Sequence, residues 1–188
     1  MNTQRIEWEK LSWSQIAELD RDTTTIVIPT GAIEQHGPHL TIDTDIYNAD
    51  AISRAVAQRV SNQRVLVAPP IWWGTSPHHL GFPGTISLKN ETFTNILMDT
   101  VSSLKPHGFY RFLIVNGHGG NAPVGALALQ MMTENPKLSI KFHNWYNQPR
   151  TWEAAMAISR GGSHGNWMEN FPWTRLAHAP APSGSKPS

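Results

Sequence analysis

The segment TIVIPTGAIEQHGPHLTIDTD, residues Thr25–Asp45, opens with an apolar run and ends in two carboxylates. Its first five residues are continuously apolar and β-branched rather than alternating, which is typical of a strand covered on both faces of a sheet. Comparable short apolar runs recur further along the chain, so we predict a set of buried strands. These runs are Val65–Ala68 (VLVA), Phe112–Val115 (FLIV) and Leu138–Phe142 (LSIKF).

Helical patterns lie between these runs. The stretches 46–60 and 91–104 each place apolar residues along one stripe, with Asn90 as the expected N-cap of the second, and 122–133 follows the third strand directly. Alternation of strand and helix favours an α/β fold with a mostly parallel central sheet. The Gly/Pro/Trp-rich stretch 69–89 has little periodicity and is long for a structureless connection, so we expect it to be functional.

The composition narrows the class of protein. With 188 residues, we expect one domain over residues 1–177 and a disordered, Pro/Ser/Ala/Gly-rich tail over 178–188. The net charge of +1 and the lack of a Lys/Arg run argue against a nucleic-acid partner. No apolar stretch is long enough for a membrane span, and we expect a cytoplasmic protein. Because the chain has no cysteine, any bound metal needs nitrogen and oxygen ligands.

Polar side chains follow the ends of the predicted strands. Glu34 and His36 come after the first strand, Asp45 lies at the entry to the next helix, and His118 follows the third strand. In open α/β sheets, ligands bind at the carboxyl ends of the strands, so these side chains should meet at one edge. Carboxylate and imidazole ligands suit Zn, Mn, Fe or Co in a hydrolytic site, and we expect Asp45 to bridge two ions.

Each of these residues also has an ordinary explanation. A lone histidine in a loop is more often a hydrogen-bonded surface residue than a ligand, and NGHGGN, residues 116–121, could be a turn with a helix cap. The coincidence of two histidines and two carboxylates at several strand ends favours the metal site.

The sequence resembles the creatininase (creatinine amidohydrolase) family. Four blocks in family order carry the resemblance and cover most of residues 25–175. They are PTGAIEQHGPHLTIDTD (29–45), GTSPHHLGFPGTISL (74–88), NGHGGN (116–121) and, more weakly, GGSHGNWMENFPWTR (161–175). The resemblance implies a three-layer α/β/α sandwich, a cofactor of divalent metal, two ions of Zn, Mn or Fe, and a homo-oligomer, a hexamer in the family.

The resemblance also implies a ligand set. Residues matching Glu34, Asp45 and His118 hold one metal, and those matching His36 and Asp45 hold the second. Creatinine-cleaving members supply the remaining ligand from a glutamate two residues after the NGH histidine, where this chain has Gly120. The resemblance points to Glu169 as the replacement ligand.

The family's substrate-side residues are transferred in the same way. His164 and Glu169 match a histidine and a glutamate that assist proton transfer, and His79 matches a histidine of the second block that contacts substrate. We also assign substrate binding to Gly119, Gly120 and Trp167, the glycines through backbone N–H groups that hold an oxyanion. Ordinary packing is an alternative for Trp167 and for Trp72, Trp73, Trp145 and Trp152, and we assign no role to His78, His107, His143 and His178.

The resulting hypothesis is a metal-dependent hydrolase that opens a small polar cyclic amide with a metal-activated water. The missing glutamate and the altered fourth block favour a substrate other than creatinine. One alternative is a hydrolase of a cyclic diketone in inositol or sugar catabolism. The other, suggested by a chain shorter than typical members, is a truncated, non-catalytic metal-binding relative.

Overall fold

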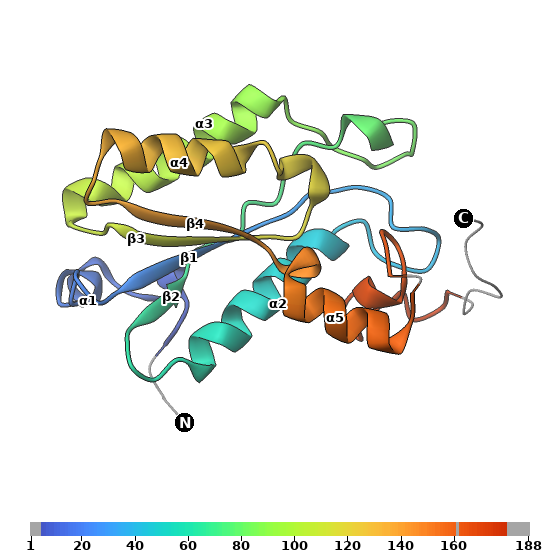
Figure 1. The fold of residues 1–188 in the computed structure, drawn as a ribbon, viewed down its shortest axis with the longest axis horizontal. Coiled ribbons are helices and arrows are strands. Elements are labelled where there is room, and N and C mark those ends of the chain that lie inside the picture. Colours follow the sequence, from blue (N-terminus) through green and yellow to red (C-terminus); the bar gives the residue numbers. More distant parts are fainter. Residues whose placement is uncertain (1–4, 161, 180–188) are drawn as a thin grey trace.

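The computed structural model describes residues 5–160 and 162–179. A four-stranded parallel sheet lies at its centre, in the order β2-β1-β3-β4 (Figure 1). All three strand pairings are parallel, and this confirms the predicted α/β fold. The strands are β1 (Thr25–Thr30), β2 (Val65–Val67), β3 (Arg111–Asn116) and β4 (Ser139–Asn144).

Helices cover both faces of this sheet and make a three-layer sandwich (Figure 1). One face carries α2 and α5, and the other carries α3 and α4. Helix α3 begins at Asn90 itself: the N-cap is Lys89, whose side chain makes no capping hydrogen bond, so the cap prediction was wrong. The helices are α1 (Trp13–Ala17), α2 (Thr44–Arg59), α3 (Asn90–Leu104), α4 (Val124–Glu134) and α5 (Pro149–Ile158).

Alternate residues of β1 feed two separate cores. Ile26 and Ile28 pack with apolar residues of α3 and α4, whereas Val27 packs with those of α2. Because both faces of the strand are buried, its side chains are apolar without interruption, as the sequence pattern predicted. The two cores hold the sheet between its helices and fix where its strands end.

The carboxyl ends of β1 and β3 mark the point where the direction of winding reverses. The chain leaves β1 through α2 to reach β2 on one side, and it returns through α3 to β3 on the other side of β1. Connections that leave such a point on opposite faces open a crevice between them. The last residues of β1 and β3, Thr30 and Asn116, are paired neighbours, so the loops that follow them start side by side.

The stretch 69–89 crosses this edge of the sheet with little regular structure. Single bridges tie Ile71 to Thr30 and Ile86 to Ile33, and a short 3-10 helix, η2 (Pro77–His79), lies between them. At the other end of the chain, Arg175 forms a bridge with Leu40, while residues 180–188 of the predicted disordered tail lie outside the described residues. Within the described residues, no helix combines the length and apolarity that crossing a bilayer requires.

Candidate metal centre

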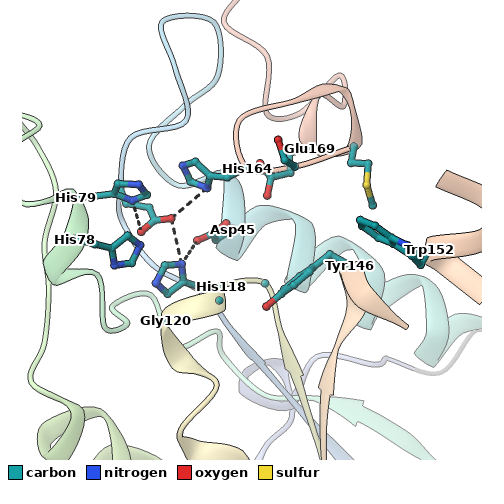
Figure 2. Close-up of a pocket in the computed structure, with 14 residues that line it drawn as sticks. Asp45, His78, His79, His118, Gly120, Tyr146, Trp152, His164 and Glu169 are labelled. Carbon is teal, nitrogen blue, oxygen red and sulfur yellow. Dashed lines mark ion pairs between the residues drawn. The ribbon is translucent and has the colours of Figure 1, made fainter. Parts of the chain in front are cut away.

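Glu34 lies in the loop after β1, and its side chain is 1% exposed. Its backbone N–H donates to Ile42 O at 2.9 Å, which fixes the loop that carries it. One carboxylate oxygen, Oε2, accepts a hydrogen bond from the Ser76 hydroxyl and lies 3.0 Å from His79 Nδ1. The other oxygen, Oε1, lies 3.1 Å from His118 Nδ1 (Figure 2).

Asp45 lies in the first turn of α2, where the positive end of the helix favours a carboxylate. The chain after β3 passes very close to it: a Cβ on Gly117 would collide with the backbone oxygen of Asp45, so only glycine fits there. Asp45 Oδ1 accepts a hydrogen bond from His36 Nε2 at 3.0 Å. Asp45 Oδ2 is 3.0 Å from His118 Nδ1. The carboxylate thus lies between two histidines, one at each oxygen.

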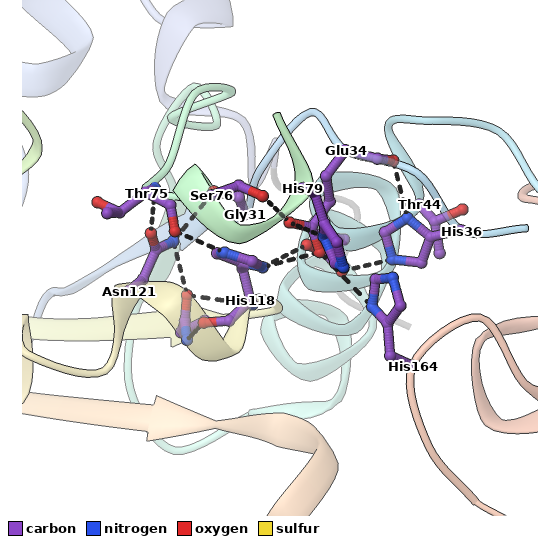
Figure 3. Close-up of polar contacts among 12 residues, drawn as sticks. Gly31, Glu34, His36, Thr44, Thr75, Ser76, His79, His118, Asn121 and His164 are labelled. Atoms are coloured by element: carbon purple, nitrogen blue, oxygen red, sulfur yellow. Dashed lines mark hydrogen bonds and ion pairs between the residues drawn. The ribbon is translucent and has the colours of Figure 1, made fainter. Parts of the chain in front are cut away.

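Backbone carbonyls fix the orientation of both histidines. His118 Nε2 lies 2.9 Å from Thr75 O, and His36 Nδ1 lies 3.1 Å from Glu34 O (Figure 3). Because a carbonyl oxygen only accepts, the nitrogen that faces it carries a proton. The other nitrogen of each ring, which in the neutral form has a lone pair, therefore faces Asp45. This is the arrangement of metal-ligating histidines, whose second nitrogen donates to a backbone oxygen.

The buried carboxylates of Glu34 and Asp45 are stabilised by positive charge nearby. Asp45 is 3% exposed, and the ion pairs that reach it and Glu34 within the described part of the chain all come from histidines. Burial disfavours protonation of His36, but the hydrogen bond and charge of Asp45 outweigh it and raise the pKa to about 9. Burial opposes protonation of His118 as well, yet Asp45 and Glu34 raise its pKa to about 10. A metal ion would therefore compete with the protons on His36 and His118 for the same ring nitrogens.

Glu34 itself is held as an anion. Burial alone would raise the pKa of its carboxyl, but hydrogen bonding and charge from His118, together with hydrogen bonds from Ser76 and His79, lower it well below the usual range. A permanently ionised carboxylate with histidines around it is a donor set for a divalent cation. Ligand atoms of Glu34, His36 and Asp45 all lie within 4.8 Å of one another, so the residues present fit a metal ion.

Glu169 and His164 reach the same place from the segment after α5. Glu169 lies in the 3-10 helix η6 (Trp167–Glu169), and its Oε2 is 3.8 Å from His36 Nε2 and accepts a hydrogen bond from Gly165 N. His164 Nδ1 is 3.5 Å from Glu34 Oε1. Both residues therefore lie beside the four side chains from β1, α2 and β3, and His36, His164 and Glu169 form a further group of possible ligands.

Gly120 is packed where a side chain has no space. A Cβ there would collide with Thr75 O and lie 2.5 Å from His118 Nε2, the two atoms that share a hydrogen bond. A glutamate at this position, as in creatinine-cleaving members, is incompatible with this backbone. A further carboxylate ligand would therefore have to come from another element, and Glu169 Oε2 lies 3.8 Å from His36 Nε2.

A pocket of about 490 Å³ opens over these groups. Glu34, Asp45 and His118 lie at its base, His79, His164 and Glu169 line it, and so do Gly119 and Gly120 (Figure 2). His36 is fully buried behind this surface. The volume of the pocket is within the usual range for small-molecule sites.

The pocket wall differs from the sequence-based assignment at several positions. Among the described residues that line it, Trp167 is missing, whereas its neighbour Met168 is present, so substrate contact by Trp167 lacks support. Conversely, His78 and Tyr146 line the pocket although the sequence analysis assigned them no role, and Trp152 lines it although packing was the favoured explanation over a place in the pocket wall. For His78 a sequence signal existed, because it adjoins His79 in the stretch that forms the short helix η2. In the structure its ring stacks on that of His118, with ring centroids 5.8 Å apart.

The fold and the site together define an α/β protein with a cluster of histidines and carboxylates, able to hold a metal ion, at the switch point of its sheet. The family model of creatinine amidohydrolases (creatininases) matches residues 9–173. The chain belongs to the creatininase family.

Individual relatives agree with this assignment. A mycofactocin precursor peptide peptidase of Mycobacterium tuberculosis is 42% identical over 118 residues, covering 59% of this chain and 46% of the relative. A 3-dehydro-scyllo-inosose hydrolase of Thermotoga maritima is 30% identical over 145 residues, covering 76% and 45%. A solved structure described as "Creatininase Mn" superimposes with a TM-score of 0.71 at 24% identity, covering 86% of this chain and 69% of that one, and supports the fold. The chain thus spans less than half the length of these two curated relatives.

Proposed function

We propose that this protein is a divalent-metal-dependent hydrolase that cleaves a small amide, with a cyclic amide as the first candidate. The observation that carries the proposal is the convergence of Glu34, Asp45 and His118 on the wall of one pocket, with His36 buried behind them and hydrogen-bonded to Asp45. Support also comes from its relatives, which include a peptidase and a creatinine amidohydrolase, both cleaving amide bonds.

The donor atoms suggest two adjacent cation positions. Glu34 Oε1, Asp45 Oδ2 and His118 Nδ1 surround the first, and His36 Nε2, Asp45 Oδ1 and Glu169 surround the second. Asp45 would help to hold both ions, because each of its oxygens faces a different histidine. When bound, a divalent ion such as Zn, Mn or Fe would supply Lewis-acid activation of a water molecule and of the scissile carbonyl.

The chain's own residues would handle the protons. Burial raises the pKa of Glu169 to about 7, helped by the charges of Asp45 and Glu34 and opposed by His36 and the Gly165 N–H. A carboxyl group with a pKa near neutrality can both accept and release a proton at working pH. Burial and the neighbouring His36 lower the pKa of His164, which keeps its ring neutral and able to accept a proton.

The pocket wall indicates a small substrate with an apolar or flat side. Trp152 lies on one side and Gly120 on the other, with Tyr146 between them (Figure 2). Met168 and Gly119 also line the pocket. We assign the two glycines to hold the carbonyl oxygen through their N–H groups. The relative from Thermotoga maritima, which aligns with 76% of this chain, supports a cyclic ketone as the alternative substrate.

The experiment is a metal and activity assay on the purified protein. Metal content would be measured after loading with Zn or Mn, followed by hydrolysis of a panel containing cyclic amides, short peptides and cyclic ketones. Asp45→Ala should lose both metal and activity, whereas Asp99→Ala, an exposed residue of α3, should keep both. Full metal retention in Asp45→Ala would contradict the bridging role. Metal binding without turnover of any panel member would instead favour the non-catalytic alternative.

A further inference from the structure

Gln35 lies between two candidate ligands, Glu34 and His36, and its amide is oriented by the backbone. The N–H of Gly37 donates to Gln35 Oε1 at 2.9 Å. Turning the amide over would place its NH2 group against that N–H, so two donors would face each other. The oxygen is therefore fixed on the Gly37 side. The donor nitrogen Nε2 faces two histidine rings, with His79 Nε2 at 3.3 Å and His164 Nε2 at 3.2 Å.

The backbone carbonyl of Gln35 determines the tautomer of His164. His164 Nε2 is 2.7 Å from Gln35 O, an atom that can only accept. At that distance Nε2 must carry the proton, because two lone pairs would otherwise repel each other. The Gln35 NH2 group also lies 3.2 Å from His164 Nε2, but the carbonyl contact is the shorter of the two and decides the assignment. The neutral ring then has its lone pair on Nδ1, which lies 3.5 Å from Glu34 Oε1 and faces the metal centre (Figure 3).

The side chain of Gln35 determines the opposite tautomer for His79. An NH2 group can only donate, so His79 Nε2 at 3.3 Å accepts and carries no proton. The proton of the neutral ring is then on Nδ1, which lies 3.0 Å from Glu34 Oε2. The His79 and His164 rings stack with centroids 4.7 Å apart, and this packing holds both orientations together.

We propose that Gln35 is a positioning residue that sets opposite tautomers of two histidines: His79 presents an N–H to Glu34, and His164 presents a lone pair to the metal centre. The proposal deepens the proposed function and rests on it for its catalytic meaning. His79 and the Ser76 hydroxyl together occupy Glu34 Oε2, which leaves Oε1 on the side of His118 for a cation. His164 Nδ1 is left as a metal ligand or as a base for a proton from substrate.

The test reads the tautomers directly. Histidine side-chain 15N shifts, recorded by long-range 1H–15N NMR on the metal-free and the zinc-loaded protein, distinguish a protonated from an unprotonated ring nitrogen. In the wild type we expect His79 Nε2 unprotonated and His164 Nε2 protonated. Finding His79 protonated on Nε2, or His164 protonated on Nδ1, would overturn the proposal.

Two variants of Gln35 sharpen this test. Gln35→Glu keeps an acceptor for the Gly37 N–H but turns an acceptor oxygen toward His79, so a proton should move onto His79 Nε2. Gln35→Met removes the donor, so the preference of His79 for a proton on Nδ1 should weaken and depend on Glu34 alone. In both, His164 should keep its proton on Nε2, because its partner is the backbone carbonyl. This internal control separates a tautomer effect from general loss of structure, and an unchanged His79 in Gln35→Glu would contradict the proposal.

A metal titration adds a functional measure. Partners of metal ligands typically contribute 10- to 100-fold in affinity, so zinc affinity should fall by about that factor in the uncharged variant Gln35→Met. Gln130→Met, at an exposed residue of α4, is the matched control and should bind zinc like the wild type. Undiminished zinc affinity in Gln35→Met would count against the proposal. The tautomers are also measured in the metal-free protein, where no activity is needed. A wrong tautomer assignment can therefore be distinguished from a failure of the hydrolase proposal.

Discussion

Replacing Gly120 by alanine tests the packing around the metal centre. The added methyl group would lie 2.5 Å from His118 Nε2 and closer still to Thr75 O, between two atoms that are hydrogen-bonded at 2.9 Å. One of these atoms is backbone, so the clash cannot be relieved by turning a flexible side chain. Overpacking of this kind costs about 1 to 3 kcal/mol.

That cost converts into measurable shifts. For a chain of this length each kcal/mol lowers Tm by roughly 2 to 4 °C, so Gly120→Ala should melt about 2 to 12 °C below the wild type. Loss of the carbonyl partner should also release the His118 ring and weaken zinc binding by about 10- to 100-fold. Thermal unfolding followed by circular dichroism and zinc titration by calorimetry measure the two effects.

Gly81 provides the matched control, because a Cβ at that position has no atom within 4 Å. Gly81→Ala should leave both the melting temperature and the zinc affinity unchanged. If Gly120→Ala melted at the same temperature as the wild type and bound zinc with the same affinity, the steric explanation for glycine at this position would be wrong. Gly120→Glu should likewise fail to provide a ligand.

Four further experiments have defined outcomes. If Glu169 is a metal ligand, Glu169→Gln should lower the number of zinc ions bound per chain by one, which metal analysis measures. If zinc stoichiometry stays the same but the reaction rate loses its pH dependence near pH 7, Glu169 is a proton shuttle, and pH–rate profiles show this. Ser76→Ala removes a hydrogen bond to the buried Glu34 carboxylate and should destabilise the fold by about 1.5 to 3 kcal/mol, measured by urea unfolding. Zinc binding at neutral pH should release protons, because the pKa values of His36 and His118 are raised to about 9 and about 10. Calorimetry in buffers of different ionisation enthalpy measures this proton release, and zinc binding without it would contradict the prediction. In the metal-free protein the stabilisation from protonated His36 should be complete below about pH 6.5 and disappear as pH rises through about 9.

The sequence by itself determined the layers of this protein. Apolar runs such as Thr25–Pro29 predicted the strands because both faces of a parallel sheet are buried, and their order along the chain predicted helices between them. It also indicated that Glu34, Asp45 and His118 follow strand ends or begin a helix. These signals are local: a strand or a helix start is encoded within a few neighbouring residues.

Only the tertiary structure decided which side chains share the pocket wall. Met168 lines the pocket and the adjacent Trp167 does not, although both lie in the same short helix. Tyr146 and His78 also line it, although the sequence analysis assigned neither residue a role. It also decided why Gly120 cannot be a glutamate, because Thr75, distant in sequence, packs against it. Such contacts depend on how separate loops pack together at the sheet edge, and no pattern within one segment encodes that distance.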